Sequence, residues 1–273
     1  MVGAHLTTCT SHGVTLLSDE RRPGGVTFAF TERTGGVSTG SYASLNLGDA
    51  CGDDPACVAE NRRRALVALG APGLDGRLVN PRQVHGDHVV VIAQGSPDAV
   101  RTAQEEARAG ADAVVCAAPD VPVLLCYADC VPVVLAAPGC FAVIHSGWKG
   151  TIARISRRAL RLLCEVGGVG AGEVSAYVGP HIMGADYKVS QELLDRFAAE
   201  FGAGVCLPKR HLDLGAAVRQ TLLEEGLHTD AIAACDASTA TTTDRFFSYR
   251  ASGGSCGRHG ALAVLSGPLS EEV

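Results

Sequence analysis

Apolar residues in the central third of the chain form continuous runs rather than an alternating pattern. The runs cover residues 113–117, 121–127, 131–136 and 141–144, and they are separated by proline, an Asp-Cys pair and glycine. Runs of this length without alternation are typical of strands that are covered on both faces. We therefore expect these segments to form a largely buried sheet.

Helices are predicted on either side of this region. One helix is expected to open at Asp53-Asp54-Pro55 and to stop at Gly70, because proline suits the first turn and glycine the C-terminus. Apolar residues recur at helical spacing in residues 152–163, 191–201 and 212–223. Further strands are predicted at residues 26–31, 174–178 and 261–265. This mixture predicts an α/β fold, a single layered domain in which flanking helices cover a mixed, largely buried sheet.

The chain contains no internal repeat and no low-complexity linker, so one domain is the simplest division. We assign residues 26–268 to this domain, residues 1–25 to an N-terminal segment and residues 269–273 to a C-terminal tail. The arginines of the 152–163 helix lie off its apolar stripe, and we interpret them as a solvated surface.

Composition excludes several classes of protein. With 23 Lys and Arg against 29 Asp and Glu in 273 residues, the net charge is −6, which argues against a nucleic-acid partner. No stretch approaches the roughly 20 apolar residues of a membrane span. The first 25 residues lack a basic start followed by an apolar run, so we see no secretory signal and expect a cytoplasmic protein. The sequence does not predict an oligomeric state.

Cysteine and histidine supply the candidate chemistry. The eleven cysteines include no Cys-x-x-Cys pair, so we expect most of them to be reduced core residues. Cys130 interrupts two apolar runs, His145 ends the next run, and His85 stands beside a glycine in Gln-Val-His-Gly. A Cys with two His and an open fourth position fits a catalytic zinc site. A Cys–His nucleophile pair or satisfied core residues fit the same pattern.

Other polar residues near these motifs have two interpretations each. Asp129 either orients a ligand histidine or serves as a turn residue. His88 is interpreted as lying outside the ligand set, because a fourth protein ligand would close the site. His181 lies in a segment that has the potential to line a pocket. We interpret the remaining candidates as structural, namely Arg62 and Arg63 on a helix surface and Trp148 in the core.

A family resemblance covers roughly residues 26–266. The strings that carry it, in this order, are TERTGGVSTGSYASLNLGDACGDDPACVAENRRRAL, QVHG, ADAVV, ADCVPVVLA, HSGWKGT, VGPHI, LDLGAAVRQTLLEEG, FFSYR and GRHGALAVL. The chain resembles the laccase-domain family, formerly described as multicopper polyphenol oxidases and now as purine nucleoside phosphorylases with adenosine deaminase activity. The Ala-Asp-Cys-x-Pro-Val and His-x-Gly-Trp-Lys-Gly strings are the most specific to it.

The resemblance implies a site and a reaction. It implies that His85, Cys130 and His145 bind zinc and carry the catalysis, and that Arg33 and Asn46 lie near the substrate. The implied activities are a transferase reaction of purine nucleosides (adenosine, inosine or methylthioadenosine) with phosphate and a hydrolase reaction on adenosine. The segment 178–190 departs from the family pattern, since it lacks a second Gly-Pro pair and the Glu before Val189. Substrate preference is therefore the weakest part of the resemblance.

Three other functions are weighed against this one. A multicopper oxidase needs about ten imidazoles, many in His-x-His pairs. This chain has nine His and no such pair, although the same soft ligands would let copper bind. A cysteine hydrolase would use Cys130 as nucleophile and His145 as base on an amide or thioester, for instance in peptidoglycan precursor editing. A non-catalytic module would merely hold a nucleotide.

Overall fold

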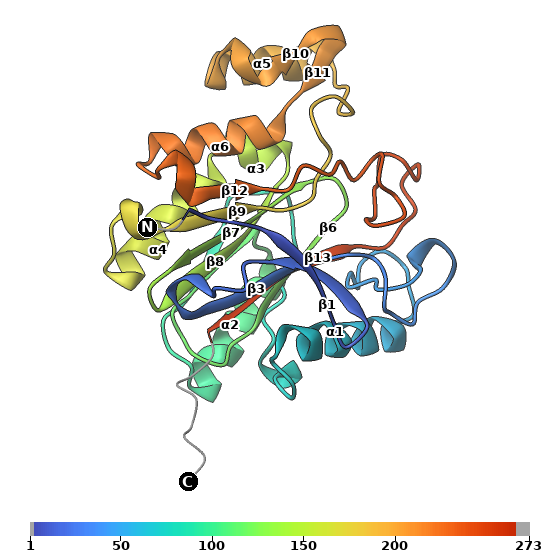
Figure 1. Ribbon diagram of the computed structural model, residues 1–273, viewed down its shortest axis with the longest axis vertical. Coiled ribbons are helices and arrows are strands. Elements are labelled where there is room, and N and C mark those ends of the chain that lie inside the picture. The colour runs from blue at the N-terminus through green and yellow to red at the C-terminus, as the bar shows by residue number, and fades with distance from the viewer. Residues whose placement is uncertain (1–2, 266–273) are drawn as a thin grey trace.

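Two β-sheets packed face to face form the centre of the structure, a computed structural model that describes residues 3–265. Helices cover the outer face of each sheet, so the layers follow the order helix, sheet, sheet, helix (Figure 1). The expected α/β class with flanking helices is confirmed. The tail predicted at residues 269–273 lies outside the described residues.

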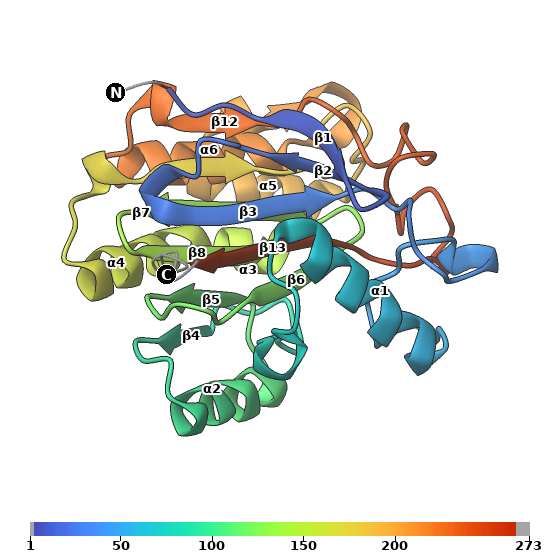
Figure 2. The same cartoon turned by 60° about the horizontal axis from the view of Figure 1, so that its bottom comes forward.

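The five-stranded sheet is antiparallel throughout. Its spatial order is β1 (Thr7–Ser11), β2 (Val14–Ser18), β3 (Val26–Thr31), β13 (His259–Leu265) and β6 (Val123–Tyr127). Figure 2 shows these strands side by side, with the hairpin of β1 and β2 at one edge. Residues 7–18, which the sequence places in an N-terminal segment, thus extend this sheet through the pairing of β2 with β3.

The six-stranded sheet is mixed. Its spatial order is β12 (Ile232–Ala234), β9 (Ser175–Val178), β7 (Val131–Ala137), β8 (Cys140–Ser146), β5 (Ala113–Cys116) and β4 (Val89–Ile92). The pairs β12–β9 and β4–β5 are parallel, and the other three are antiparallel. Of the central apolar runs, three form β5, β7 and β8 here, whereas the run at 121–127 contributes β6 to the other sheet.

The single sheet expected from the sequence is thus divided into two. A continuous apolar run indicates that both faces of a strand are covered, but it does not indicate whether a helix or a second sheet covers them. Here the second sheet covers one face, and the rings of Phe28 on β3 and Tyr177 on β9 lie 4.4 Å apart in the core between the sheets.

Side chains along β8 alternate between the two faces of the six-stranded sheet, as the pleat requires. Phe141 and Val143 point into the core between the sheets, and Ala142 and Ile144 point towards the helices. His145 continues the first set. Its imidazole therefore lies at the end of the core between the sheets, and not among the helices.

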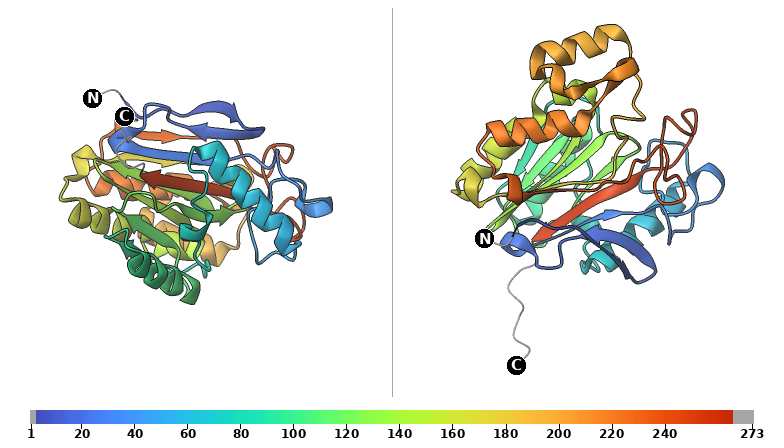
Figure 3. Two further views of the ribbon diagram at one scale, coloured as in Figure 1. Left: turned by 90° about the horizontal axis from the view of Figure 1, so that it is seen from below. Right: turned by 45° about the horizontal axis from the view of Figure 1, so that its top comes forward.

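Helices flank the sheets on both sides. Within residues 3–265 they are α1 (Pro55–Leu69), α2 (Pro97–Ala109), α3 (Trp148–Ile152), α4 (Ile155–Gly167), α5 (Gln191–Phe201) and α6 (Leu214–Glu224). α1 covers the five-stranded sheet, and α4 and α6 cover the six-stranded sheet. α5 and the short pair β10 (Cys206–Leu207) and β11 (His211–Leu212) project beyond α6 (Figure 3). No helix of the described chain has the length and apolarity needed to cross a membrane.

The helix predicted over 152–163 is interrupted in the structure. Arg154 separates α3 from α4 and has a left-handed φ of 58°. Its guanidinium pairs with Glu200 and Glu224 and lies over the ring of Phe201. Arg154 therefore ties α4 to α5 and α6 instead of belonging to a solvated surface. Two neighbouring arginines, Arg157 and Arg161, also pair with Glu225.

Close packing at the end of β9 yields a test of the contact between the sheets. A Cβ on Gly179 would lie 2.4 Å from the ring of the buried Phe30 on β3. We expect Gly179→Ala to lower the free energy of unfolding by about 1–3 kcal/mol, because the ring must move within a filled core. Urea denaturation measures this change. Gly204→Ala is the control, because nothing lies within 4 Å of its added Cβ. Equal denaturation midpoints for the two variants would contradict the packing described here.

Candidate metal centre

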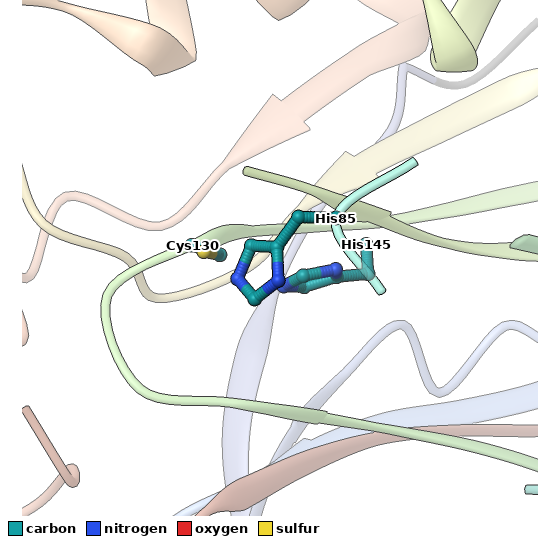
Figure 4. A group of neighbouring side chains, drawn as sticks. All are labelled: His85, Cys130 and His145. Carbon is teal, nitrogen blue, oxygen red and sulfur yellow. The ribbon is translucent and has the colours of Figure 1, made fainter. Parts of the chain in front are cut away.

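Three segments that are far apart in the chain bring His85, Cys130 and His145 together. His85 lies in the loop before β4, Cys130 in the turn between β6 and β7, and His145 on β8. β7 and β8 are antiparallel neighbours, and Pro132 on β7 is directly opposite His145. The strands next to Cys130 and His145 are thus neighbours in one sheet, which brings the thiol and the imidazole to the same end of it. Figure 4 shows the three side chains pointing towards one another at the end of these strands.

The three side chains are close enough to share one ion. Each offers one ligand atom, and these atoms all lie within 4.8 Å of one another. Burial decreases across the group. The side chain of His145 is 3% exposed, Cys130 is half-buried and His85 is exposed. The cluster is therefore closed towards the core and open to solvent on the side of His85.

Gly147, in the His-Ser-Gly-Trp string, allows this close approach. A Cβ at Gly147 would lie 2.9 Å from the ring of His85 and 3.1 Å from the sulfur of Cys130. The φ of Gly147 is −76°, which any residue can adopt. The glycine is therefore required by the space that the cluster occupies and not by an unusual backbone conformation.

Asp112 holds the ligand histidines in position from the buried side of the cluster. Its fully buried carboxylate accepts from Nδ1 of His145 at 2.8 Å and from the backbone N–H of His85 at 2.9 Å. It also accepts from the N–H groups of Val84 at 3.2 Å and Gly86 at 2.7 Å. The N–H of His145 donates to the Asp112 carbonyl at 2.7 Å. One residue thus fixes both the ring and the backbone of His145 and the whole turn that carries His85.

The electrostatics favour a charged cluster. Burial alone would raise the pKa of the Cys130 thiol, but the charges and hydrogen bonds of His145 and His85 outweigh burial and lower this pKa to about 6. Burial acts to lower the pKa of His145, but Cys130 and Asp112 raise it to about 9. Hydrogen bonds likewise hold the pKa of Asp112 below its usual range against the effect of burial. At neutral pH, Cys130 is therefore available as a thiolate, which is the form that binds metals.

This donor set fits a transition-metal ion. A thiolate and two imidazoles are soft and borderline ligands that suit zinc or copper. Because Asp112 holds Nδ1 of His145, the other nitrogen, Nε2, remains for the metal. A further position faces solvent beside His85, as in catalytic sites with three protein ligands. Within residues 3–265, this is the one group of three or more such side chains that is close enough to hold a metal.

The structure separates the two interpretations of Asp129. Its carboxylate accepts from the hydroxyl of Thr239 and from the N–H of Arg250, both at 2.7 Å. Asp129 has a left-handed φ of 87°, and its carbonyl accepts from the N–H of Ile182. Asp129 is therefore a turn residue that ties the Cys130 turn to two later segments. The orienting carboxylate for the ligand histidine is Asp112 instead.

The other polar residues near the motifs lie outside the cluster. His88 pairs with Glu106 on the surface, and Trp148 packs among the helices. His181 is buried, and its Nδ1 lies 2.8 Å from the carbonyl oxygen of Gly179. Two arginines of α1 are also engaged, since Arg62 donates to the carbonyl of Leu47 and Arg63 pairs with Glu60.

Arg33 and Asn46 do not join the His–Cys–His cluster. Asn46 is fully buried, and its side-chain amide contacts Gly48, Asp53 and the N–H of Arg258. The guanidinium of Arg33 donates to two backbone carbonyls and lies 4.3 Å from the ring centroid of Phe247. Burial lowers the pKa of Arg33. Both residues instead support the loops that precede β13 and α1.

Asp112 is the functional residue that sequence reasoning misses. It stands in Ala-Asp-Ala-Val-Val, directly before a fully buried strand. An acidic residue at such a position must be satisfied by partners, because an unpaired buried carboxylate is strongly unfavourable. This signal was available in the sequence. Its partners, however, come from residues 27 and 33 positions away, which local patterns do not reveal.

The fold and the site define a class of α/β protein with two stacked sheets and an open His–Cys–His cluster at the end of their shared core. Comparison with known proteins identifies the family. The chain belongs to the family described as multi-copper polyphenol oxidoreductase laccase, whose model matches residues 27–266. The resemblance found in the sequence is thereby confirmed.

Relatives and solved structures cover nearly the whole chain. A protein of Deinococcus radiodurans named purine nucleoside phosphorylase is 38% identical over 246 residues, which are 88% of this chain and 89% of that protein. The crystal structure of Bacillus licheniformis hypothetical protein YfiH has a TM-score of 0.83 at 26% identity and covers 92% of this chain and 96% of its own. The structure of YlmD from Geobacillus stearothermophilus has a TM-score of 0.81 at 27% identity, with coverages of 97% and 99%.

The hydrogen bonds of Asp112 generate a test of the metal centre. We expect Asp112→Asn to weaken the affinity of the cluster for added zinc by about tenfold to a hundredfold, because an amide cannot accept the same set of N–H donors. Competition with a chromophoric chelator measures the affinity. Asp98→Asn is the matched control, since Asp98 is an exposed carboxylate that pairs with Arg101 on the surface. If both variants bound zinc as tightly as the parent protein, Asp112 would not orient the ligands.

Proposed function

We propose that this protein is a zinc-dependent purine nucleoside phosphorylase, acting on adenosine, inosine and methylthioadenosine, that also deaminates adenosine. The observation that carries the proposal is the convergence of one thiolate and two imidazoles on a point that is buried on one side and open on the other. The name of the Deinococcus relative, purine nucleoside phosphorylase, supports the substrate class. Zinc is favoured because it is stable with this mixed set and keeps one position open.

Both reactions are substitutions that need no redox chemistry. In phosphorolysis, a phosphate oxygen bonds to C1′ of the ribose while the bond from C1′ to N9 breaks. The electron pair stays with the purine, which takes up the proton of the phosphate. In deamination, water bonds to C6 of adenosine and ammonia leaves. A bound zinc ion supplies Lewis acidity and lowers the pKa of coordinated water towards 7.

The residues of the chain contribute geometry and charge. Asp112 keeps a proton on Nδ1 of His145 and so leaves Nε2 free to bind the metal. Because His85 is exposed, a nucleoside has room to approach the cluster from that side. His145 is buried and fixes the opposite side of the site. For Arg33 and Asn46 we propose indirect contributions to substrate binding, through the loops that their hydrogen bonds support.

The electrostatics of the cluster favour a second candidate, a cysteine hydrolase that acts on an amide. The lowered pKa of Cys130 and the raised pKa of His145 describe a thiolate–imidazolium pair, which is the activated form of a cysteine nucleophile. Such an enzyme needs no metal, and its thiolate reacts readily with iodoacetamide. Amide hydrolysis that survives chelation, together with rapid alkylation of Cys130 in the protein as purified, would favour this candidate.

The first test of the proposed function follows nucleoside turnover. Adenosine incubated with phosphate should give adenine and ribose 1-phosphate, with some inosine, and chromatography separates these products. We expect Cys130→Ala to reduce both activities about a thousandfold or more, because the three ligands hold the one metal that both reactions use. Cys57→Ala on α1 is the control and should retain both. Undiminished activity in Cys130→Ala, or no turnover by the parent protein, would contradict the proposal.

The second test concerns phenol oxidation, the activity that the family name describes. We expect no appreciable oxygen uptake with a phenolic substrate in added copper, because nine histidines without a His-x-His pair cannot build a trinuclear copper cluster. An oxygen electrode measures the uptake. Rapid uptake that disappears in both His85→Ala and His145→Ala would show that this cluster does support phenol oxidation.

A further inference from the structure

Arg250 is tied to the turn that carries Cys130 and has no carboxylate partner for its guanidinium within residues 3–265. Its backbone N–H donates to the carboxylate of Asp129 at 2.7 Å, and Asp129 precedes the ligand Cys130 in the same turn. The segment between β12 and β13 is therefore fastened at Arg250 to the turn that carries the thiolate. This anchoring ties an arginine from the C-terminal part of the chain to the turn that carries Cys130.

The guanidinium of Arg250 is held in place but not neutralised. Its Cζ lies 5.1 Å from the ring centroid of Tyr187, and its Nη1 donates to the carbonyl of Lys188 at 3.0 Å. Arg250 is exposed, and no acidic residue of the described chain forms an ion pair with it. Its Nε and Nη2 have no hydrogen-bond partner within residues 3–265, and a guanidinium edge with free N–H groups matches two oxygens of a phosphate.

Tyr187 connects this arginine to the thiolate. Burial raises the pKa of Tyr187 to about 12, and the negative charges of Cys130 and Asp129 act in the same direction, whereas Arg250 opposes them. Of these groups, Arg250 lies against the tyrosine ring, and Cys130 and Asp129 act on the tyrosine hydroxyl through their charges. Tyr187 belongs to the segment in which the sequence departs from the family pattern, so the sequence alone gives no role to this side chain.

Neighbouring cations are already engaged. Arg33 donates to the carbonyls of Ala43 and Thr243, and Arg245 pairs with Glu32. Nη1 of Arg258 donates to the carbonyls of Cys256 and Gly257. The ammonium of Lys149 lies over the ring of Trp148, which packs with the helices. Like Arg33 and Arg258, Arg250 forms no ion pair within residues 3–265, and of these five cations it is the one whose backbone is hydrogen-bonded to the Asp129–Cys130 turn.

We propose that Arg250 binds the phosphate co-substrate at the open side of the His85–Cys130–His145 cluster, and that Tyr187 positions the guanidinium. This inference rests on the proposed phosphorolysis, because that reaction must hold an anion beside a site that already carries the charges of Cys130 and Asp112. A fixed cation offsets this repulsion and orients the phosphate oxygen that attacks the ribose.

The kinetic test separates phosphate from nucleoside. We expect Arg250→Ala to raise KM for phosphate about tenfold to a hundredfold, the effect of losing a charge-assisted hydrogen-bonded pair. The ratio of deaminated to phosphorolysed product should rise at least about tenfold, because deamination uses water in place of phosphate. Arg22→Ala is the control. Arg22 is also an exposed arginine, but it precedes Pro23-Gly24, and the carbonyl of Gly24 accepts from the N–H of Gly139, which follows the end of β7 remote from Cys130.

Variants at two further positions test the geometry. Tyr187→Phe keeps the ring under the guanidinium and should retain the parent KM for phosphate, whereas Tyr187→Ala should raise it. A raised KM for phosphate in Lys149→Ala, without a change in Arg250→Ala, would overturn the assignment and place the phosphate at the start of α3.

Calorimetry with inorganic phosphate provides a readout that does not depend on turnover. The zinc-loaded parent protein should bind phosphate, and Arg250→Ala should bind it at least about tenfold more weakly. If phosphate binds in this way but nucleosides are not cleaved, the proposed function is wrong and the anion site stands. Equal affinities in the two proteins, or no binding by the parent protein, would overturn the anion site.

Discussion

The buried carboxylate of Asp112 is the constraint on which the metal centre depends. It receives hydrogen bonds from the ring of His145 and from three successive N–H groups of the turn around His85. An ionised carboxylate with no exposed surface would be strongly destabilising without such donors. The converse also holds. The carboxylate has its full set of hydrogen-bond donors only when the turn around His85 and the end of β8 lie close together, and this arrangement also brings the ligands together. The stability of the fold and the geometry of the site are therefore set by one interaction.

Backbone conformation near the ligands carries strain that these hydrogen bonds hold in place. His85 and Asp129 have φ values of 59° and 87°, in a region that residues other than glycine seldom adopt. Such conformations persist where surrounding contacts overdetermine them, and they gather at functional sites. Asp112 supplies those contacts for His85, and Thr239 and Arg250 supply them for Asp129. Two carboxylates thus place two ligand turns, one before β4 and one between β6 and β7.

Sequence patterns predict the parts of this structure that depend on local periodicity. The strand at 26–31 and the helix at 191–201 occur with the predicted bounds, since their signals lie within one segment. The run at 121–127 belongs to the five-stranded sheet, and Arg154 interrupts the helix predicted over 152–163. Both features depend on the segments that pack against these residues, and no local pattern records those segments. The site divides in the same way. His85, Cys130 and His145 stand out because polar residues interrupt or end apolar strands and because of a family resemblance. The hydrogen-bond partners of Asp112 and Arg250 are distant in sequence.

The gradient of burial across the cluster explains how one site can be both rigid and accessible. His145 is fixed at the end of the core between the sheets, where its ring lies 5.5 Å from that of Tyr127 and its proton is held by Asp112. His85 lies at the exposed side of the cluster. Its turn is held in position by hydrogen bonds to the buried carboxylate of Asp112. The exposed side of the cluster is therefore separate from the buried contacts that hold the ligands. Preorganisation of this kind lowers the cost of assembling the reacting groups, because the folding of the two sheets has already ordered them.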